Sequence, residues 1–331
     1  MKRLLRRHEF YVFIVIVILS LIITSLNRRF FTLENLFDLL KSYSLLGIFA
    51  VGVLIVLISG GIDISFTAVA TVAEYLMAIL ITKYTTNIIT SFLIAGAVGI
   101  ILGVVNATLI YFLRIPTIIT TIATLNIYYG LLSYISGGRW IYNLPTWFRE
   151  FSNIKVLQLI GETGISYGLS IVTAIWIVVL ILAWVILRYT TLGRSIYAIG
   201  GNINSARRAG LNILRIQLFV YCFIGFLAGI AGVVHALLVQ VVAPNAIVGK
   251  ELDVIAAVVL GGANIAGGSG TIIGTIMGVA LVALMSNGLT LVRVSAFWYN
   301  LCIGFIIMIS VSVTAFQLRV RERRAAIMGV E

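Results

Sequence analysis

Long apolar segments separated by short polar connections recur along the chain from residue 11 to residue 317. A helix of about 20 mostly apolar residues crosses the roughly 30 Å of hydrocarbon in a bilayer, and most of these segments approach that length. The pattern therefore predicts an all-α integral membrane protein with about ten transmembrane or re-entrant helices. The predicted helices cover about residues 11–26, 43–58, 65–82, 88–112, 117–135, 168–187, 216–240, 252–262, 271–288 and 295–317.

The two longest connections in the first half of the chain are expected to lie at the membrane surface. Residues 28–42, RRFFTLENLFDLLKS, alternate apolar and charged positions in a helical pattern but are too polar to span, which predicts an interfacial helix on the outer surface. The loop at 136–167 is long and mixed. Its residues Trp140, Tyr142 and Trp147 suit the headgroup zone, so we expect this loop at the membrane boundary.

Composition supports this fold class. The chain of 331 residues is 61% hydrophobic and 10% charged, whereas soluble domains contain about 25% charged residues. Because no separate polar region is left over, we expect one polytopic domain over residues 1–331. The first apolar segment follows a basic stretch but lacks a small-residue cleavage site, so we interpret it as a retained helix. Cys222 and Cys302 lie inside apolar segments and are interpreted as packing residues.

The basic residues predict the orientation in the membrane. The formal net charge of +12 comes from Lys and Arg near the ends of apolar segments, without aromatic stacking residues between them, so we predict no nucleic-acid partner. Positive charge favours the cytoplasmic side, which places both termini there and requires an even number of crossings. Arg28 and Arg29 then fall on the outer side, against the rule.

One polar break stands out in the apolar pattern. Residues 57–66 read LISGGIDISF, which puts Asp63 where an unpartnered carboxylate costs several kcal/mol. Gly60 and Gly61 are expected to end one span, and Ser65 is able to cap the next. Two roles for Asp63 are open, capping the next helix or contacting cargo, and we favour capping. Its capping partner is either its own third helix or a second break at residues 261–270.

That second break lies in ELDVIAAVVLGGANIAGGSGTIIGT, residues 251–275. Its apolar part, residues 252–260, is too short to cross the hydrocarbon and ends in glycines, which is typical of a re-entrant or broken helix. One interruption in each half of the chain predicts a pathway between two pseudo-repeated halves. The parallel between the halves is one of kind, because matching residues do not demonstrate a repeat.

The segment at 188–215 is the only sizeable hydrophilic stretch predicted on the cytoplasmic side. Its NINSARRAG portion can form one or two helical turns, with Asn202 or Asn204 as a cap and Gly210 as a stop. A short helix on the inner surface is a feature that a cytoplasmic partner could bind. The alternative is an ordinary positively charged connector.

Catalytic and metal-binding patterns are absent from the sequence. His8 and His235 have no Cys or carboxylate at metal-ligand spacing, and His235 is interpreted as a packed, hydrogen-bonded helix residue. No GxxxxGK[ST] motif occurs, so the chain does not bind a nucleotide by that route. We therefore predict no catalytic residue, no metal site and no enzyme activity.

Polar residues at membrane depth are candidates for a transport pathway. Glu74 follows Asp63 by about three helical turns, which puts both on roughly one face. Hydroxyls and amides on the fourth and fifth spans suit an uncharged, polyhydroxylated cargo, although threonines in membrane helices usually satisfy local carbonyls. These polar residues are Asn106, Thr117, Thr120, Thr121, Thr124 and Asn126.

Four stretches resemble the permease subunits of ABC importers for simple sugars, of the ribose, galactofuranose and autoinducer-2 type, which are related more distantly to branched-chain amino acid permeases. They are LGIFAVGVLIVLISGGIDIS (46–65), IPTIITTIATL (115–125), LGRSIYAIGGNINSARRAGLNI (192–213) and the glycine-rich stretch at 251–275. The resemblance implies the ABC importer permease fold in a bacterial cytoplasmic membrane, surrounded by lipid. It also implies a second permease chain, identical or paralogous, a cytoplasmic ABC ATPase that holds ATP and Mg, and an extracytoplasmic sugar-binding protein. This chain is then expected to bind no cofactor itself.

The resemblance also implies roles for individual residues. The predicted pathway or gate comprises Ser59, Gly60, Gly61, Asp63 and Ser65, to which the polar pattern adds Glu74, Asn106, Thr120, Thr124, Asn126, Gly261, Gly262 and Asn264. The predicted ATPase-coupling residues are Gly193, Arg194, Tyr197, Gly200, Gly201, Asn202, Arg207, Arg208 and Gly210. The chain departs from the family pattern at residues 66–68, Asn106-Ala107 and Tyr129-Gly130, which is consistent with one half of a heterodimer.

Other function classes stay open at this point. An ion-coupled secondary transporter would use Asp63 or Glu74 as its coupling carboxylate. A channel or structural membrane protein would lack energy coupling. Within the ABC permeases, a nucleoside or a branched-chain amino acid is an alternative cargo to a monosaccharide.

Overall fold

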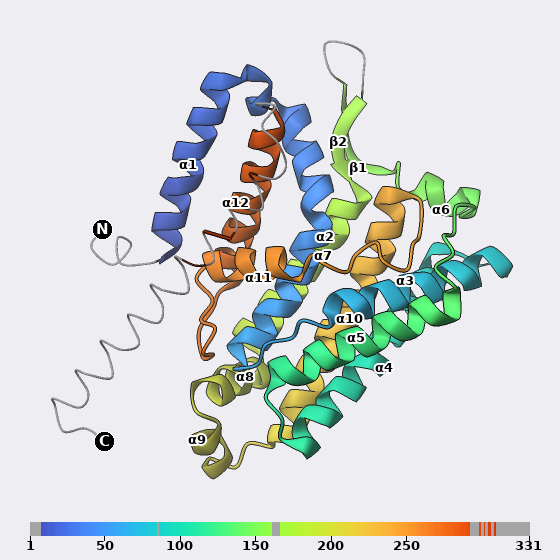
Figure 1. The fold of residues 1–331 in the computed structure, drawn as a ribbon. Helices are drawn as coiled ribbons and strands as arrows, with labels where there is room; N and C mark the ends of the chain where they lie inside the picture. Colours follow the sequence, from blue (N-terminus) through green and yellow to red (C-terminus); the bar gives the residue numbers. More distant parts are fainter. Residues whose placement is uncertain are drawn as a thin grey trace.

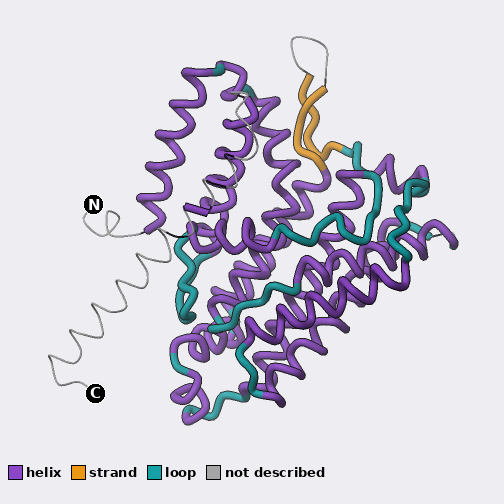
Figure 2. The backbone as a smooth tube through the Cα atoms, viewed as in Figure 1, coloured by secondary structure: helices purple, strands orange, loops and turns teal. Residues whose placement is uncertain are grey.

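The computed structural model describes residues 8–84, 86–160, 166–291, 298, 301, 304, 305 and 308. These residues are mostly helical, with one two-stranded hairpin among them (Figure 1, Figure 2). The last predicted helix, 295–317, lies almost entirely outside the described residues. Cys302 and the basic residues of both termini lie outside them as well.

The elements follow the predicted apolar segments closely. In the first half they are α1 (His8–Leu26), η1 (Arg28–Phe31), α2 (Leu33–Ile58), α3 (Phe66–Lys83), α4 (Ile88–Leu113), α5 (Thr117–Ser136) and α6 (Thr146–Phe151). The remainder are β1 (Lys155–Ile160), β2 (Ser166–Ser170), α7 (Ile171–Tyr189), α8 (Thr191–Gly201), α9 (Ile203–Arg208), α10 (Ile213–Val239), α11 (Glu251–Leu260) and α12 (Ile272–Leu291). In the described part of the chain, eight helices are long and apolar enough to cross a membrane: α1 to α5, α7, α10 and α12. The chain is therefore a multi-pass membrane protein, as predicted.

Helix α10 lies at the centre of the fold, packed against α2, α3 and α4. Small residues let α10 and α4 approach closely. A Cβ atom on Gly225 would lie 2.2 Å from the Gly99 carbonyl oxygen, and one on Gly229 would lie 2.1 Å from that of Ala95. Lipid tails are as apolar as the helix surfaces, so such close backbone packing is the main attraction between helices in a membrane.

The helices leave two distinct ends of the molecule (Figure 1). Helices α8 and α9, residues 191–208, form one end, which we call the α8–α9 end. Helix α6 and the hairpin β1–β2 lie at the opposite end. Helix α2 connects the two, because it contacts β2 near its start and α8 near its finish. Its C-terminal part, residues 47–58, is buried throughout.

The predicted interfacial helix at 28–42 is wrong. A short 3-10 helix covers Arg28–Phe31, and residues 33–42 are the first turns of α2, begun by Thr32, whose hydroxyl oxygen accepts the Asn35 N–H at 3.3 Å. The polarity of this stretch has a simple cause. A helix of 26 residues is about 39 Å long at 1.5 Å per residue, which exceeds the hydrocarbon thickness, so its first turns reach the polar zone.

The predicted loop at 136–167 also contains regular structure. Helix α6 is followed by the antiparallel pair β1–β2, in which Leu157 lies opposite Leu169. An isolated bridge between Ile141 and Val242 ties the start of this loop to the segment after α10. The described membrane-spanning part is thus all-α, with a small hairpin at one end.

Candidate functional site

The break at residues 59–65 separates α2 from α3. Gly60 donates its N–H to the Leu57 carbonyl at 2.9 Å, and Gly61 donates to Val56 at 3.1 Å, which closes the last turn of α2. Gly60 has a φ of +84°, in the left-handed region where glycine carries no steric penalty. The glycines therefore end the span, as predicted.

Asp63 holds the start of α3. It is 2% exposed, and its Oδ1 atom accepts hydrogen bonds from the Ser65 N–H and the Ser65 hydroxyl, both at 2.7 Å. The partner of Asp63 is thus the start of its own third helix, and the described contacts give it none in the break at 261–270. Ser65 is the N-cap residue, but its side chain makes no cap hydrogen bond, so the expected serine cap is wrong. The carboxylate of Asp63 supplies the hydrogen bond in its place.

The contacts of Ser65 extend into a buried polar network. The Ser65 hydroxyl oxygen accepts from Asn106 Nδ2 at 2.7 Å, and the Tyr128 hydroxyl donates to Asn106 Oδ1 at 3.2 Å. We use the name polar network for Asp63, Ser65, Asn106 and Tyr128, all of which are buried. It joins α3, α4 and α5. Sequence reasoning missed Tyr128, although it follows Thr124 by one helical turn and therefore lies on the same face of α5.

The threonines of α5 divide into two groups. Thr117 Oγ1 accepts the Ile62 N–H at 2.9 Å, and the Thr121 hydroxyl donates to the Ile62 carbonyl at 3.3 Å. These two satisfy the extended backbone of the break, where buried amides need partners. The other polar residues of α5 that the sequence singled out bond to backbone carbonyls of the same helix or its cap: Thr120 to Pro116, Thr124 to Thr121 and Asn126 to Ile122. Their role in a pathway stays a prediction.

Glu74 pairs with His235 across α3 and α10. The His235 Nδ1 and Glu74 Oε1 atoms are 2.9 Å apart, and both residues are buried. His235 is therefore a packed, hydrogen-bonded helix residue, as the sequence predicts. Glu74 and Asp63 take part in separate sets of contacts. A third carboxylate, Glu251, accepts from the Thr67 hydroxyl and from the Gly249 N–H, which ties α11 to α3.

The segment at 188–215 forms two helices. Helix α9 has the predicted Asn202 cap, whose Oδ1 accepts the Ser205 N–H at 2.9 Å, and Gly210 follows with a φ of +82°. Sequence reasoning missed α8. The sequence predicts helical turns only in the NINSARRAG portion, whereas Thr190 begins a regular helix before it by accepting the Gly193 N–H at 3.0 Å. The exposed Arg207 and Arg208 lie in the last turn of α9.

Three segments that the sequence singled out, the break at 59–65, the stretch at 188–215 and the second break, meet through glycine backbones at the α8–α9 end. A Cβ on Gly200 would lie 1.7 Å from the Ile58 carbonyl oxygen and 2.7 Å from the Gly268 nitrogen. Gly268 also donates its N–H to Ile58 at 2.9 Å, and a Cβ on Gly267 would lie 2.7 Å from the Gly60 Cα. We call Gly60, Gly200, Gly267 and Gly268 the glycine junction. It joins the end of α2, the end of α8 and the second break.

The second break is held by its own turns and by α8. Asn264 donates its N–H to the Ser269 carbonyl at 3.0 Å, and its Oδ1 accepts the Ala266 N–H at 3.0 Å. The Tyr197 hydroxyl of α8 donates to the Gly270 carbonyl at 2.8 Å. Burial raises the pKa of this hydroxyl above its usual range, so it stays protonated and able to donate. Gly261 contacts Gly274 of α12, where a Cβ would lie 2.2 Å from the carbonyl oxygen.

A cavity of about 980 Å³ lies beside the glycine junction. Part of the predicted gate and part of the predicted coupling segment line it together, which is the main spatial result for these residues. They are Ser59, Gly60, Gly61, Gly200, Gly201, Asn202 and Arg207. The remaining predicted residues lie outside the lining of this cavity: Asp63, Ser65, Glu74, Asn106, Thr120, Thr124, Asn126, Gly193, Arg194, Tyr197, Arg208, Gly210, Gly261, Gly262 and Asn264.

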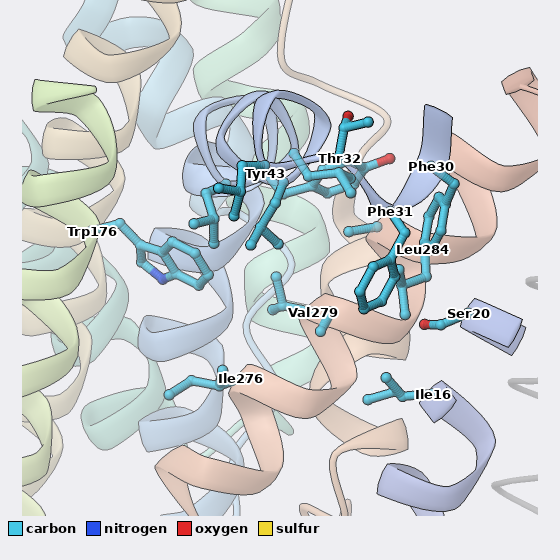
Figure 3. Close-up of a pocket in the computed structure, with 16 residues that line it drawn as sticks. Ile16, Ser20, Phe30, Phe31, Thr32, Tyr43, Trp176, Ile276, Val279 and Leu284 are labelled. Atoms are coloured by element: carbon cyan, nitrogen blue, oxygen red, sulfur yellow. The ribbon is translucent and has the colours of Figure 1, made fainter. Parts of the chain in front are cut away.

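A second cavity, of about 360 Å³, lies among α1, α2, α7 and α12 (Figure 3). Its lining is almost wholly apolar, from Ile16 on α1 to Leu284 on α12, with Trp176 closing one side. Such a surface offers few hydrogen bonds to a polar cargo. Among the described residues, no group of three or more His, Cys, Asp or Glu side chains is arranged to hold a metal ion.

Comparison with known proteins places these elements in a wider group. The family model described as "Branched-chain amino acid transport system / permease component" matches residues 35–311. The ribose import permease protein RbsC of Escherichia coli K12 is 33% identical over 91% of this chain and 91% of its own length. The Haemophilus influenzae RbsC is 31% identical over 90% of each chain. The autoinducer 2 import system permease protein LsrC of Photorhabdus luminescens is 29% identical over 93% of this chain and 90% of its own. No solved structure matches the chain.

Proposed function

The chain belongs to the family of branched-chain amino acid transport system permease components, and on that premise we propose that it is the permease subunit of an ATP-driven sugar importer. The cargo is a monosaccharide, a pentose, hexose or related sugar, which moves into the cytoplasm. The relatives named as ribose and autoinducer 2 import permeases support this cargo class. The hydroxyls and amides that face the breaks are suited to an uncharged, hydroxyl-rich molecule.

One observation carries the proposal. The end of α8 contacts the end of α2 and the second break through glycine backbones, so the segment predicted to receive the ATPase touches both predicted gate segments. Backbone contacts of this kind transmit a displacement directly, because few flexible side chains lie between the parts. An importer driven from outside the chain requires such a contact.

The proposed partners follow from this arrangement. A cytoplasmic ABC ATPase, which holds ATP and Mg, engages α8 and α9, and the chain itself binds no cofactor. A second permease chain, identical or paralogous, completes the membrane-spanning unit. An extracytoplasmic sugar-binding protein delivers cargo at the end that carries α6 and the hairpin. The assembly resides in a bacterial cytoplasmic membrane.

In the proposed mechanism, ATP-driven closure of the ATPase moves α8 and α9. The displacement reaches Ile58 and Gly60 through Gly200, and it reaches the second break through Gly268 and the Tyr197–Gly270 hydrogen bond. The start of α3 stays fixed by the polar network. The break at 59–65 therefore bends against a fixed point, which opens or closes the cavity beside it.

A second candidate is a proton-coupled transporter, which the buried Glu74–His235 pair favours. A carboxylate and an imidazole at 2.9 Å in a membrane interior are chemically able to exchange a proton. Proton coupling does not require a docking helix for a motor, whereas the α8–α9 end provides one. The importer is therefore the better supported of the two.

Uptake by membrane vesicles separates these candidates. Vesicles that contain the chain with its ATPase and sugar-binding protein are loaded with ATP, and entry of radiolabelled D-ribose and D-glucose is measured. We expect uptake of at least one sugar that depends on internal ATP and survives a protonophore. Uptake abolished by the protonophore yet indifferent to ATP would overturn the proposal.

A further inference from the structure

Two buried oxygen atoms of α10, on residues that line the large cavity, lack hydrogen-bond partners among the described residues. The Gln217 Oε1 and Tyr221 hydroxyl are buried, and neither makes a hydrogen bond to the described residues. Both residues line the cavity of about 980 Å³ beside the glycine junction. They are four positions apart on one helix, so they lie on the same face, one turn from each other.

Such atoms are uncommon in native proteins, where buried polar groups nearly always have a partner. In the part of the chain that the structure describes, the other buried side-chain atoms without a partner belong to Glu74, Thr86 and Trp176, and none of those residues lines this cavity. The two oxygens are therefore concentrated at one place. A group that enters the cavity is the natural source of their missing hydrogen bonds.

Gly61 of the gate segment packs against the Tyr221 hydroxyl. A Cβ on Gly61 would lie 2.6 Å from this oxygen, so any other residue at position 61 would cover it. Thr117 lies beside the same hydroxyl, and Thr117 Oγ1 accepts the Ile62 N–H. The Tyr221 hydroxyl therefore lies directly against the gate segment and the start of α5.

The chemistry of the lining defines the ligand. An amide oxygen accepts a hydrogen bond from a ligand O–H, and a phenol both donates and accepts. The exposed Arg114 and Arg207 add donors at the edge of the cavity. Isoleucine side chains form part of the wall and suit the C–H faces of a sugar ring: Ile110, Ile115, Ile199 and Ile213. A wall that combines apolar side chains with placed polar groups is typical of small-molecule sites of about 300 to 1,000 Å³.

We infer that Gln217 and Tyr221 form a sugar-binding subsite in this cavity, at the α8–α9 end of the transport pathway. The inference rests on the proposed function. Gly200 and Gly201 of α8 form part of the same wall, so a displacement of α8 changes the shape of the subsite. The subsite is then the last position that a sugar occupies before release, and α8 controls that release.

The test uses the full transporter in liposomes, with the chain, its ATPase and its sugar-binding protein, and the probe is D-ribose alongside a panel of aldopentoses and aldohexoses. Tyr221→Phe removes only the hydroxyl, and Gln217→Leu removes only the amide at similar size. We expect each to lower ATP-dependent uptake about three- to tenfold, the range for one hydrogen bond to a neutral group, and the double variant more. Tyr129→Phe, on α5 outside the cavity, is the matched control and is expected to keep wild-type uptake.

Thermal unfolding distinguishes a binding role from a structural one. Replacing a buried, unpartnered oxygen with an apolar group removes a desolvation penalty, so the melting temperature of both variants is expected to stay equal or rise. Lower uptake with unchanged or higher melting temperature supports the subsite. Lower uptake with a lower melting temperature assigns the two residues to packing and overturns it.

The remaining outcomes separate this inference from the proposed function. Unchanged uptake in the double variant, with normal transport by the wild type, means that the oxygens bind only water, and the inference fails alone. No ATP-dependent uptake of any sugar by the wild type contradicts the proposed function itself.

Discussion

The glycine junction and the polar network lie at the two ends of the same break yet are built in opposite ways. The junction joins α2, α8 and the second break through backbone atoms, with Gly200 against Ile58 and Gly267 against Gly60. The polar network joins α3, α4 and α5 through side-chain hydrogen bonds that start from Asp63. The glycine junction contains almost no side chains, whereas the polar network is formed mainly by side chains.

The difference indicates which part moves. In a buried network whose members satisfy one another, shifting a member leaves polar groups unpaired, so the network resists displacement. Backbone surfaces of glycine have few side-chain contacts to lose. Among the described residues, two hydrogen bonds link the segments that the junction joins, from Gly268 to Ile58 and from the Tyr197 hydroxyl to Gly270. We expect the junction to move against a network that stays in place.

Filling the junction is expected to have the largest effect on stability. In Gly200→Ala, the new Cβ would meet the Ile58 carbonyl at 1.7 Å, and backbone atoms shift only at a high cost. We expect destabilisation of about 3 kcal/mol, at the upper end for overpacking, together with loss of uptake. Thermal unfolding in detergent measures the first effect and vesicle uptake the second.

The neighbouring glycine provides a matched control. A Cβ on Gly201 has no atom within 4 Å, so Gly201→Ala is expected to leave the stability close to that of the wild type. Equal effects at the two positions would mean that helix α8, and not its contact with α2, responds to the substitution.

The buried pair on α3 and α10 provides the next test. Glu74→Leu leaves His235 buried without the partner that lies 2.9 Å away, which costs about 2 kcal/mol. Glu74→Gln retains a hydrogen-bonding side chain and is expected to lose less than half as much. Melting temperatures give this ranking. If instead Gln lost uptake as completely as Leu while staying folded, Glu74 would act through its charge, as a proton-coupled transporter requires.

The cap of α3 is expected to contribute less. Asp63→Asn keeps an oxygen that can accept the Ser65 N–H, whereas Asp63→Leu keeps none. We expect the Leu variant to lose about 1 kcal/mol, the usual value of a helix cap, and the Asn variant to be close to the wild type in uptake. An equal loss of uptake in both would contradict the capping role and favour a charge-dependent one.

The sequence predicted the spans well, because their apolar pattern depends on local residues alone. It also placed the stop at Gly60 and the cap at Asn202, which are local features too. It missed α8, because the sequence alone does not distinguish glycines that permit close helix packing from glycines that end a helix. The context that distinguishes them, the carbonyl of Ile58 beside Gly200, comes from a segment distant in the sequence.

The same limit applies to the polar residues of the site. Two partners for Asp63 were open, and contacts decided between them. Thr117 and Thr121 were indistinguishable from Thr120 and Thr124 by spacing, yet the first two bond to Ile62 and the others to their own helix. Spacing assigns residues to one face of a helix, but the segment packed against that face determines the hydrogen-bond partner of each residue.

The most direct test of the account concerns the outer surface of α9, where a stability effect is expected to be smallest. Arg207 and Arg208 are exposed, so reversing both charges should leave the protein inserted and its melting temperature close to the wild type. We predict that Arg207→Glu with Arg208→Glu abolishes ATP-dependent uptake, whereas Arg207→Lys with Arg208→Lys, which preserves charge, retains most of it. Normal uptake by the charge-reversed protein would contradict the claim that the α8–α9 end couples an ATPase to the gate.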